Sequence, residues 1–357
     1  MVRVALTVEQ NWFAVPGGTA RSTNRLIRAL AEHHPNEVQL RGFHGFHRRS
    51  PTLPVPSELS TTSIPVPGRL LVQLWGRKGW PAVDRWVPDA DLVHSPAYVL
   101  PSTVRPTVVT LHDLAFVRHP EWFTAHGVRF FNRLLDRVRH GDQQVIVPSA
   151  ETAADCVAAG ISEARLHVIP WGVNPTTVDT DRARSFAAEL GATAPFVLFV
   201  GTLEPRKNLT ALADAMALVP DTPLVVVGPK GWGDVEVEGA LLLGERSAEE
   251  VAMLMAAARV VAYPSTLEGF GLPVLEAMAQ GTPVVVHAGS TPAAVAGPGG
   301  VEVDTGDAGQ FAEAIRTLVD DPSFHADRSA AARERATEFT WENTAALTIA
   351  VYREAAQ

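Results

Sequence analysis

Short, continuously apolar runs of β-branched residues recur along the chain, each bounded by turn-forming residues and followed by a helical pattern. Such runs lack polar alternation, so we expect strands that are buried on both faces. Strands of this kind belong to parallel sheets covered by helices, which predicts an α/β, doubly wound fold. The predicted strands are Val2–Val8, Val38–Phe43, Leu92–His94, Val108–Leu111, Val145–Val147, Phe196–Val200, Leu224–Val227, Val260–Tyr263 and Val284–Val286.

The length of 357 residues exceeds what one hydrophobic core usually serves, so we expect two domains with a cleft between them. Val168-Ile169-Pro170 ends the first series of strands, and the turn-rich stretch Trp171 to Pro175 follows as the linker. The predicted domains are 1–173 and 174–340, and a C-terminal helix at about 341–357 joins the first. Residues 50–68 are rich in proline and are predicted to form a long loop.

No stretch approaches the roughly 20 uninterrupted apolar residues of a membrane span, and the N-terminus lacks the order of a signal peptide. The single Cys156 cannot form an internal disulfide, and it is best explained as a small apolar residue on a helix. These features predict a cytoplasmic protein.

Charge is unevenly distributed: residues 1–175 carry 18 Lys and Arg against 14 Asp and Glu, whereas residues 176–357 carry 12 against 25. The basic excess of the first half is compatible with peripheral contact at the inner face of a membrane, and equally with a merely solvated face. Segment 69–86, with interleaved apolar and basic residues, leaves the same alternatives, although packing on its own sheet is favoured. Scattered basic residues and the lack of a recognition motif argue against nucleic acid.

The most informative segment runs from Glu268 to Glu276. Pro273 suits the first turn of a helix, so the helix begins directly after Gly269-Phe270-Gly271. Backbone N–H groups of Gly271 and Leu272 at this helix start favour phosphate or sugar oxygens. Glu268 projects from the preceding loop and Glu276 lies one turn in, where carboxylates would accept hydrogen bonds from sugar hydroxyls.

A second segment, Gly201 to Leu209, follows the strand Phe196–Val200 and precedes a helix for which Asn208 is a plausible N-cap. Arg206 and Lys207 thus lie at the carboxyl end of a parallel strand, where doubly wound sheets bind ligands. Together they could neutralise a diphosphate without magnesium; a solvated, charged turn explains this dipeptide alone equally well.

The ordered set of segments resembles the retaining glycosyltransferases of family 4, which have the two-domain GT-B fold. The resemblance is closest to the branch that contains mannosyltransferases of polysaccharide assembly. It rests on Gly17-Gly18, His94, His112-Asp113, Pro170 to Asn174, Gly201 to Leu209, Leu243 to Ser247, and two glutamates separated by seven residues, Glu268 and Glu276.

This resemblance implies a role for each matching position. Arg206 and Lys207 would bind the donor diphosphate and stabilise the departing nucleotide. Glu276 would bind the ribose hydroxyls, and Glu268 would face the transferred sugar together with the backbone of 269–271. The further implied donor contacts are the backbone of Gly201, the Gly17-Gly18 loop, His112 near the reacting carbon, and Gly244, Glu245 and Arg246 around the base; Ser247 and Glu250 form a capping box.

The implied function is transfer of a hexose, mannose among the candidates, from a GDP-, UDP- or dTDP-sugar to an acceptor that no motif identifies. The family resemblance favours front-face attack over double displacement through a carboxylate. Trp171 and Pro292-Ala293 depart from the residues common in the family, which weakens any inference about the exact donor.

No cofactor or metal is expected, because the histidines lack metal-ligand spacing and His44 with His47 has no partner nearby in sequence. His94 could be a core histidine or a site residue. Two alternative functions on the same fold are a nucleotide-sugar epimerase and a nucleotide-sugar-binding protein without turnover. A nicotinamide oxidoreductase lacks support, since no Gly-x-Gly-x-x-Gly follows the first strand.

Overall fold

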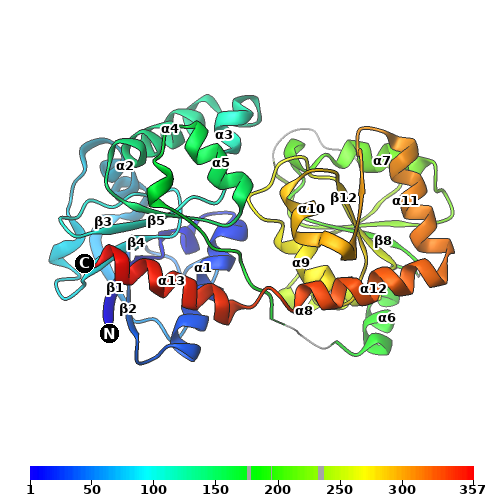
Figure 1. The fold of residues 1–357 in the computed structure, drawn as a ribbon, viewed down its shortest axis with the longest axis horizontal. Helices are drawn as coiled ribbons and strands as arrows, with labels where there is room; N and C mark the ends of the chain where they lie inside the picture. The colour runs from blue at the N-terminus through cyan, green and yellow to red at the C-terminus, as the bar shows by residue number, and fades with distance from the viewer. Residues whose placement is uncertain (175–177, 194, 232–236) are drawn as a thin grey trace. The chain divides into compact units, whose positions relative to one another are not determined.

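The computed structural model describes residues 1–174, 178–193, 195–231 and 237–357, with the side chain of Lys78 excepted, and Pro175 of the predicted linker lies outside these ranges. The chain divides into two compact units (Figure 1). Unit 1 comprises Met1–Gly172 and Thr340–Gln357, and unit 2 comprises Val173–Phe339. The predicted boundary at 173/174 lies one residue from this division.

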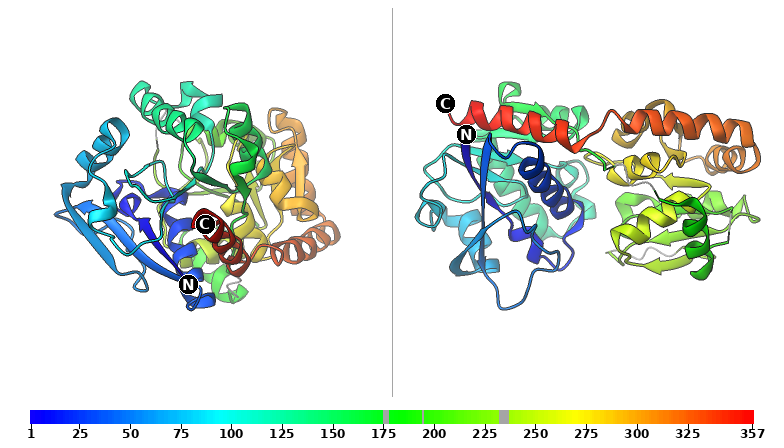
Figure 2. Two further views of the ribbon diagram at one scale, coloured as in Figure 1. Left: turned by 60° about the vertical axis from the view of Figure 1, so that its left-hand side comes forward. Right: turned by 90° about the horizontal axis from the view of Figure 1, so that it is seen from below.

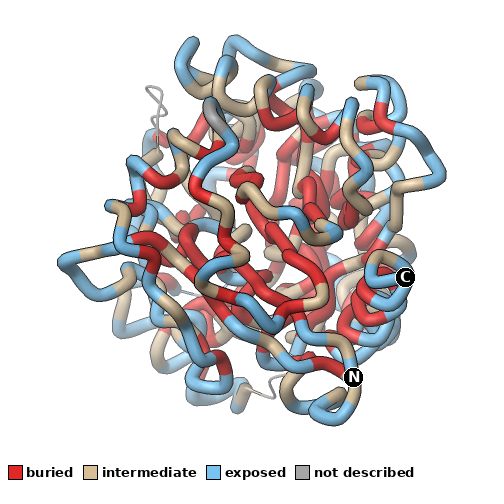
Figure 3. The backbone as a smooth tube through the Cα atoms, turned by 90° about the vertical axis from the view of Figure 1, so that its left-hand side faces the viewer, coloured by how far each residue is buried: buried red, intermediate tan, exposed pale blue. Residues whose placement is uncertain are grey.

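In the described part of unit 1, a seven-stranded parallel sheet has the order β3-β2-β1-β4-β5-β6-β7. Buried residues concentrate along its strands, and exposed ones on the surrounding helices and loops (Figure 3). Its strands are β1 (Val2–Thr7), β2 (Val38–Phe46), β3 (Thr61–Pro67), β4 (Leu92–Ser95), β5 (Thr107–Thr110), β6 (Gln144–Val147) and β7 (Leu166–Val168). Its α-helices are α1 (Gly17–His33), α2 (Gly68–Lys78), α3 (Ala115–Arg118), α4 (Ala125–His140), α5 (Ala150–Ala158) and α13 (Trp341–Ala355).

Helices cover both faces of this sheet. The C-terminal helix α13 packs against α1 on one face (Figures 1 and 2), so the end of the chain completes the core of unit 1. On the other face, α2 contributes Leu71 and Trp75 to one buried cluster, and α4 and α5 contribute to another, which contains Cys156. Burial raises the pKa of the Cys156 thiol to about 12, which fits an inert core residue.

Segment 69–86 packs mainly on its own sheet, as favoured from the sequence. Leu71, Trp75 and Val83 are buried in the α2 face of unit 1, whereas Leu70 and Trp80 are exposed. None of the described helices combines the length and apolarity needed to cross a bilayer. Membrane contact through this unit stays a prediction.

Over its described residues, unit 2 contains a six-stranded parallel sheet with the order β10-β9-β8-β11-β12-β13. Helices α7 and α11 pack together on one face, and α6, α8 and α9 follow one another on the other. Its strands are β8 (Val197–Val200), β9 (Leu224–Val227), β10 (Leu241–Gly244), β11 (Val260–Tyr263), β12 (Val284–His287) and β13 (Gly300–Val303). Its α-helices are α6 (Thr180–Glu189), α7 (Leu209–Ala217), α8 (Ala248–Ala257), α9 (Leu272–Ala279), α10 (Thr291–Ala296), α11 (Ala308–Asp320) and α12 (Pro322–Ala336).

The proline-rich stretch 50–68 is a loop only in part, which corrects the prediction. Its second half forms strand β3, in which Pro65 and Pro67 lie at the edge of the sheet. An edge strand hydrogen-bonds on one side only, so a residue without an N–H is tolerated there.

Candidate active site

The candidate site of unit 2 lies at the point where its strand order reverses. From β8 the chain proceeds to β9 and β10 on one side, and from β11 it proceeds to β12 and β13 on the other. In doubly wound sheets, ligands bind at the carboxyl ends of the strands at such a switch point. Arg206 and Lys207 follow β8, and Glu268 follows β11. The topology therefore brings the two segments selected from the sequence to one place.

Backbone hydrogen bonds hold the loop after β8 in place. Leu203 N donates to Pro229 O at 3.1 Å, and Gly231 N donates to Leu203 O at 3.1 Å. A single 3₁₀ turn, Pro205–Lys207, then presents the basic pair. Asn208 occupies the position before α7 with φ of 52°, but its side chain makes no capping bond. Asn208 thus occupies the predicted N-cap position, but without a capping hydrogen bond from its side chain.

Arg206 and Lys207 form ion pairs with two buried carboxylates. Lys207 Nζ lies 2.5 Å from Glu268 Oε1, and Arg206 Nη1 lies 2.8 Å from Glu268 Oε2. Arg206 Nη2 lies 2.7 Å from Glu204 Oε1. Lys207 is 7% exposed, Glu268 8% and Glu204 3%, so this is not the solvated turn that the sequence also allowed.

Burial and charge act in opposite directions on this cluster. Burial would raise the pKa of Glu268, but Arg206, Lys207 and hydrogen bonds from Lys207 and Ser265 outweigh it and lower that pKa to about 2. The pKa of Lys207 is lowered because burial outweighs the attraction of Glu268. Glu268 is thus a carboxylate at neutral pH and holds two cations.

Glu268 does not project from its loop as the sequence predicted. Its Oε1 accepts hydrogen bonds from Lys207, from Tyr263 Oη at 3.1 Å and from Ser265 Oγ at 2.6 Å. The sequence reasoning did not assign a role to Tyr263, Ser265 or Glu204. The available signal was their position, because each lies in or next to the two segments that carry the family resemblance.

The start of α9 has the predicted geometry. Gly271 has φ of 100° before Leu272, a proline occupies the first turn, and Gly281 follows the helix with φ of 77°. A Cβ on Gly271 would meet Pro292 at 3.2 Å, which adds to the requirement for glycine. Phe270 is buried and packs edge-on against Phe339, with the ring centroids 5.9 Å apart, so its side chain belongs to the core of unit 2.

The other predicted donor contacts of unit 2 lie on neighbouring elements. Glu276 lies within α9 and is half-buried, and Gly201 directly follows β8. Gly244 ends β10 with φ of 68°, and Glu245 and Arg246 precede α8. The predicted capping box of α8 is confirmed, since Ser247 Oγ accepts from Glu250 N at 3.2 Å and Glu250 Oε2 accepts from Ser247 N at 2.8 Å.

Unit 1 has its own switch point, between β1 and β4. Gly17 and Gly18 follow β1 but form the first turn of α1, not the predicted loop. Gly17 has φ of 63°, and a Cβ on either glycine would meet no atom within 4 Å. The two glycines therefore leave the start of α1 open.

His112 follows β5 in unit 1, and a hydrogen bond to the backbone carbonyl of Pro96 orients its ring. Its Nε2 lies 2.8 Å from the carbonyl oxygen of Pro96, so Nε2 carries the proton and Nδ1 is the acceptor in the neutral ring. Burial lowers the pKa of His112, which favours this neutral form. The ring lies beside Tyr98 and Trp171, with centroids 6.3 and 5.8 Å away.

His94 is a core histidine. It is completely buried, Nδ1 lies 2.7 Å from Tyr352 Oη, and Nε2 lies 2.9 Å from Thr110 Oγ1. Burial lowers the pKa of His94 to about 3, so the ring is neutral. Of the two alternatives from the sequence, the structure favours the structural one.

His44 and His47 have no partner nearby in the sequence, but they contact residues of unit 1 that lie far from them in the chain. Trp12 stacks on both rings, with centroids 4.3 and 4.6 Å away. His47 Nε2 also lies 3.0 Å from Oε1 of the buried Glu9. Among the described residues, no group of three or more His, Cys, Asp or Glu side chains is arranged to hold a metal ion.

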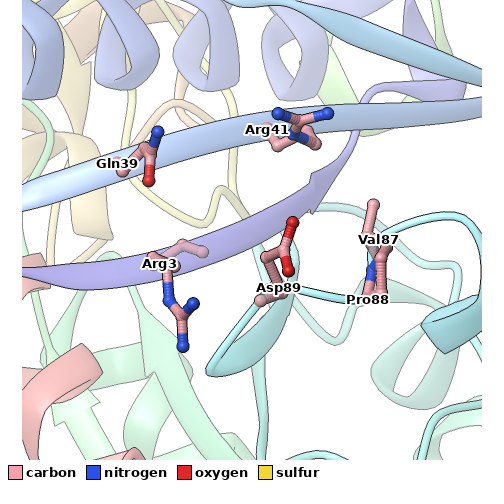
Figure 4. A pocket seen from close by; sticks show the side chains of 8 residues that line it. Arg3, Gln39, Arg41, Val87, Pro88 and Asp89 are labelled. Carbon is pink, nitrogen blue, oxygen red and sulfur yellow. The ribbon is translucent and has the colours of Figure 1, made fainter.

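A cavity of about 90 Å³ lies in unit 1 at the opposite ends of the strands (Figure 4). Arg3 near the start of β1, Gln39 and Arg41 on β2, and Asp89 before β4 line it. Arg3 is paired with Asp91. This cavity contains none of the residues predicted for the donor site.

Comparison with known proteins bears on the family of the chain. A model of the glycosyltransferase family 4 matches residues 16–177, and a model of the glycosyl transferases group 1 matches residues 181–335. O-antigen chain mannosyltransferase B of Escherichia coli is 29% identical, covering 73% of this chain and 74% of that protein. D-inositol 3-phosphate glycosyltransferase of Mycobacterium bovis is 32% identical, covering 79% of this chain, which spans only 60% of that relative.

The solved structure of Anabaena HepE in complex with UDP and glucose superposes with a TM-score of 0.74 at 18% identity, covering 99% of this chain and 100% of that one. The two parallel sheets, their switch points and these matches lead to one assignment. The chain is a glycosyltransferase of family 4 with the GT-B fold.

Proposed function

We propose that the chain is a retaining, metal-independent enzyme that transfers a hexose from a nucleoside diphosphate sugar to a glycan, lipid-linked or small-molecule acceptor. The observation that carries the proposal is the cluster of Arg206, Lys207 and Glu268 at the switch point of unit 2. Glu268 and Glu204 hold the two cations in place, so the cations can donate hydrogen bonds to a diphosphate without reorganisation as negative charge develops on the leaving group.

The proposed reaction breaks the bond between the sugar C1 and the phosphate oxygen, and the nucleoside diphosphate leaves with the electron pair. The acceptor oxygen forms its bond to C1 on the same face, and its proton passes to the departing phosphate oxygen. Glu268 is not the nucleophile in this scheme, because both of its oxygens are engaged by Lys207, Arg206 and neighbouring hydroxyls.

Mannose is the first candidate for the transferred sugar, supported by the similarity to the E. coli mannosyltransferase. Glucose from a UDP-sugar donor is the second candidate, because the HepE structure contains UDP and glucose. GDP-, UDP- and dTDP-sugars should be compared by thermal shift and by release of nucleoside diphosphate with candidate acceptors. Product sugar that forms equally without any acceptor would favour the epimerase alternative.

Lys207→Ala and Glu276→Ala should each lower nucleotide release at least about tenfold, because each variant removes a proposed contact to the donor. The contact that Lys207 makes would be a charged one. Lys230→Ala and Glu313→Ala are matched controls in the same unit, since both side chains are exposed and neither is placed in the site. Unchanged rates in both site variants would contradict the assignment. Added magnesium or chelator should leave the wild-type rate unchanged.

A further inference from the structure

Tyr263 lies at the centre of the buried cluster of unit 2. It is the last residue of β11 and is completely buried. Its hydroxyl accepts a hydrogen bond from Lys207 Nζ at 2.6 Å and donates one to Glu268 Oε1 at 3.1 Å. The ring stacks on Phe199 with an interplanar angle of 14°, which fixes the position of the hydroxyl.

We infer that Tyr263 is a positioning residue for glycosyl transfer: its hydroxyl holds the Lys207 ammonium beside Glu268, at the place where the donor diphosphate binds. The inference rests on the proposed function in so far as Lys207 is a donor contact. Tyr263 acts through Lys207 and does not itself touch the substrate.

The contacts of Lys207 account for this role. An ammonium group has three N–H bonds, and Glu268 and Tyr263 accept two of them. The geometry thus leaves one N–H to be directed at a phosphate oxygen. Nζ also lies 4.9 Å from the centroid of the Tyr263 ring, so the aromatic face adds to the attraction for the cation.

Tyr263 also favours the charged form of Lys207. Burial lowers the pKa of Lys207, and Glu268 and Glu204 oppose this effect. The hydrogen bond that Tyr263 accepts from the ammonium should act in the same direction as these carboxylates. Burial and the charge of Glu268 raise the pKa of Tyr263 well above its usual value, so the phenol keeps its proton and continues to donate to Glu268. The other charged groups at the cluster are Arg206, which disfavours the Lys207 charge, and Glu204, which favours it.

Ser265 allows the role of Tyr263 to be tested by itself. Its hydroxyl donates to Glu268 Oε1 at 2.6 Å, and Arg206 donates to Oε2 at 2.8 Å. Glu268 therefore stays oriented in Tyr263→Phe, and the main loss falls on Lys207. Tyr352→Phe is the matched control, because it removes an equally buried hydroxyl that is bonded to His94 in unit 1.

The decisive measurement is the pKa of Lys207 by NMR of protein labelled with ¹³C- and ¹⁵N-lysine. Lys78, Lys207 and Lys230 are all the lysines of the sequence, so Lys207→Arg assigns the signal. Tyr263→Phe should lower the pKa of Lys207 by about one unit, and Tyr352→Phe should leave it unchanged. An unchanged Lys207 pKa in folded Tyr263→Phe would overturn the inference.

Kinetics provide the second readout. In Tyr263→Phe the basic limb of the kcat/KM profile for the donor should move to lower pH by the same amount, with the loss mainly in KM. If Tyr263→Phe does not fold, wild-type protein grown with 3-fluorotyrosine tests the same point, because its phenol is a weaker acceptor and Lys207 should again titrate lower. Absence of nucleotide release from wild type would contradict the proposed function, while the NMR titration would still decide the role of Tyr263.

Discussion

The two units have the same kind of sheet but bury different chemistry near their switch points. In unit 1, His94 is kept neutral by burial and is bonded to the uncharged hydroxyls of Tyr352 and Thr110. In unit 2, Glu268 and Lys207 are buried as ions and are bonded to each other. A neutral network mainly fixes the packing, whereas buried ions are costly unless they are paired. The charged cluster is therefore the better marker of function.

The largest expected effect is on the stability of unit 2 when one partner of the cluster is removed. Glu268→Gln leaves Lys207 without a counter-charge and Arg206 with Glu204 alone, and it should destabilise unit 2 by about 3 kcal/mol. Hydrogen exchange of β8 and β11 peptides in denaturant would measure it. The double variant Glu268→Gln/Lys207→Met should recover part of the lost stability. If Glu268→Gln alone cost less than about 1 kcal/mol, the ion pair would not be stabilising.

The second expected effect is a difference between the two units in the pH range over which each loses stability. The pKa of His94 is about 3 in the folded protein against 6.5 for the ordinary group, so acid protonates the unfolded chain first and unit 1 loses stability as pH falls below 6.5. By pH 4.5 the loss is about 2 to 3 kcal/mol. The pKa of Glu268 is also lowered, but by Arg206 and Lys207 and against the effect of burial, so its contribution to unit 2 is lost only as pH falls from 4.5 towards about 2.

Tryptophan fluorescence can follow unit 1 in this experiment, because every tryptophan except Trp232 lies within its residue ranges. His94→Gln should reduce the slope of stability against pH between 6.5 and 4.5 by about 1.4 kcal/mol per pH unit. An unaltered slope would mean that His94 is protonated in the folded state. His112, whose pKa is also lowered by burial, contributes in the same direction and is present in both proteins.

The smallest effects should be alike in the two units. Ser149 caps α5 in unit 1 by accepting from Thr152 N at 3.1 Å, and Ser247 caps α8 in unit 2. Ser149→Ala and Ser247→Ala should each cost about 1 kcal/mol in urea unfolding. Ser247→Ala should cost slightly more, since it also breaks the reciprocal bond of the capping box. Costs that differ by more than this small amount would mean that the two units differ outside their buried networks as well.

The central strands could be predicted from the sequence, and three of the four edge strands of the described sheets could not. Every residue of β9 and β11 is buried, so each run is continuously apolar and easily recognised. The missed strands β3, β10 and β13 all lie at sheet edges and are partly exposed. Their pairing depends on a neighbouring strand far away in the sequence, which local patterns do not report.

The sequence predicted the residues of the candidate site but not the contacts between them. The sequence identified Arg206, Lys207 and Glu268 because ordered motifs carry them, and placed the start of α9 correctly from Pro273. It could not show that Glu268 binds the two cations, since Lys207 and Glu268 lie 61 positions apart in the sequence. From the sequence, Tyr263 could be predicted only as the last residue of a strand.

The sequence by itself determined the α/β class, the family and the segments that form the candidate donor site, because these follow from local periodicity and from short ordered motifs. Only the tertiary structure decided which buried groups are charged, that His94 is a core residue and that Tyr263 bridges Lys207 to Glu268. These properties depend on burial and on contacts between distant segments, and the strand order of each sheet creates both.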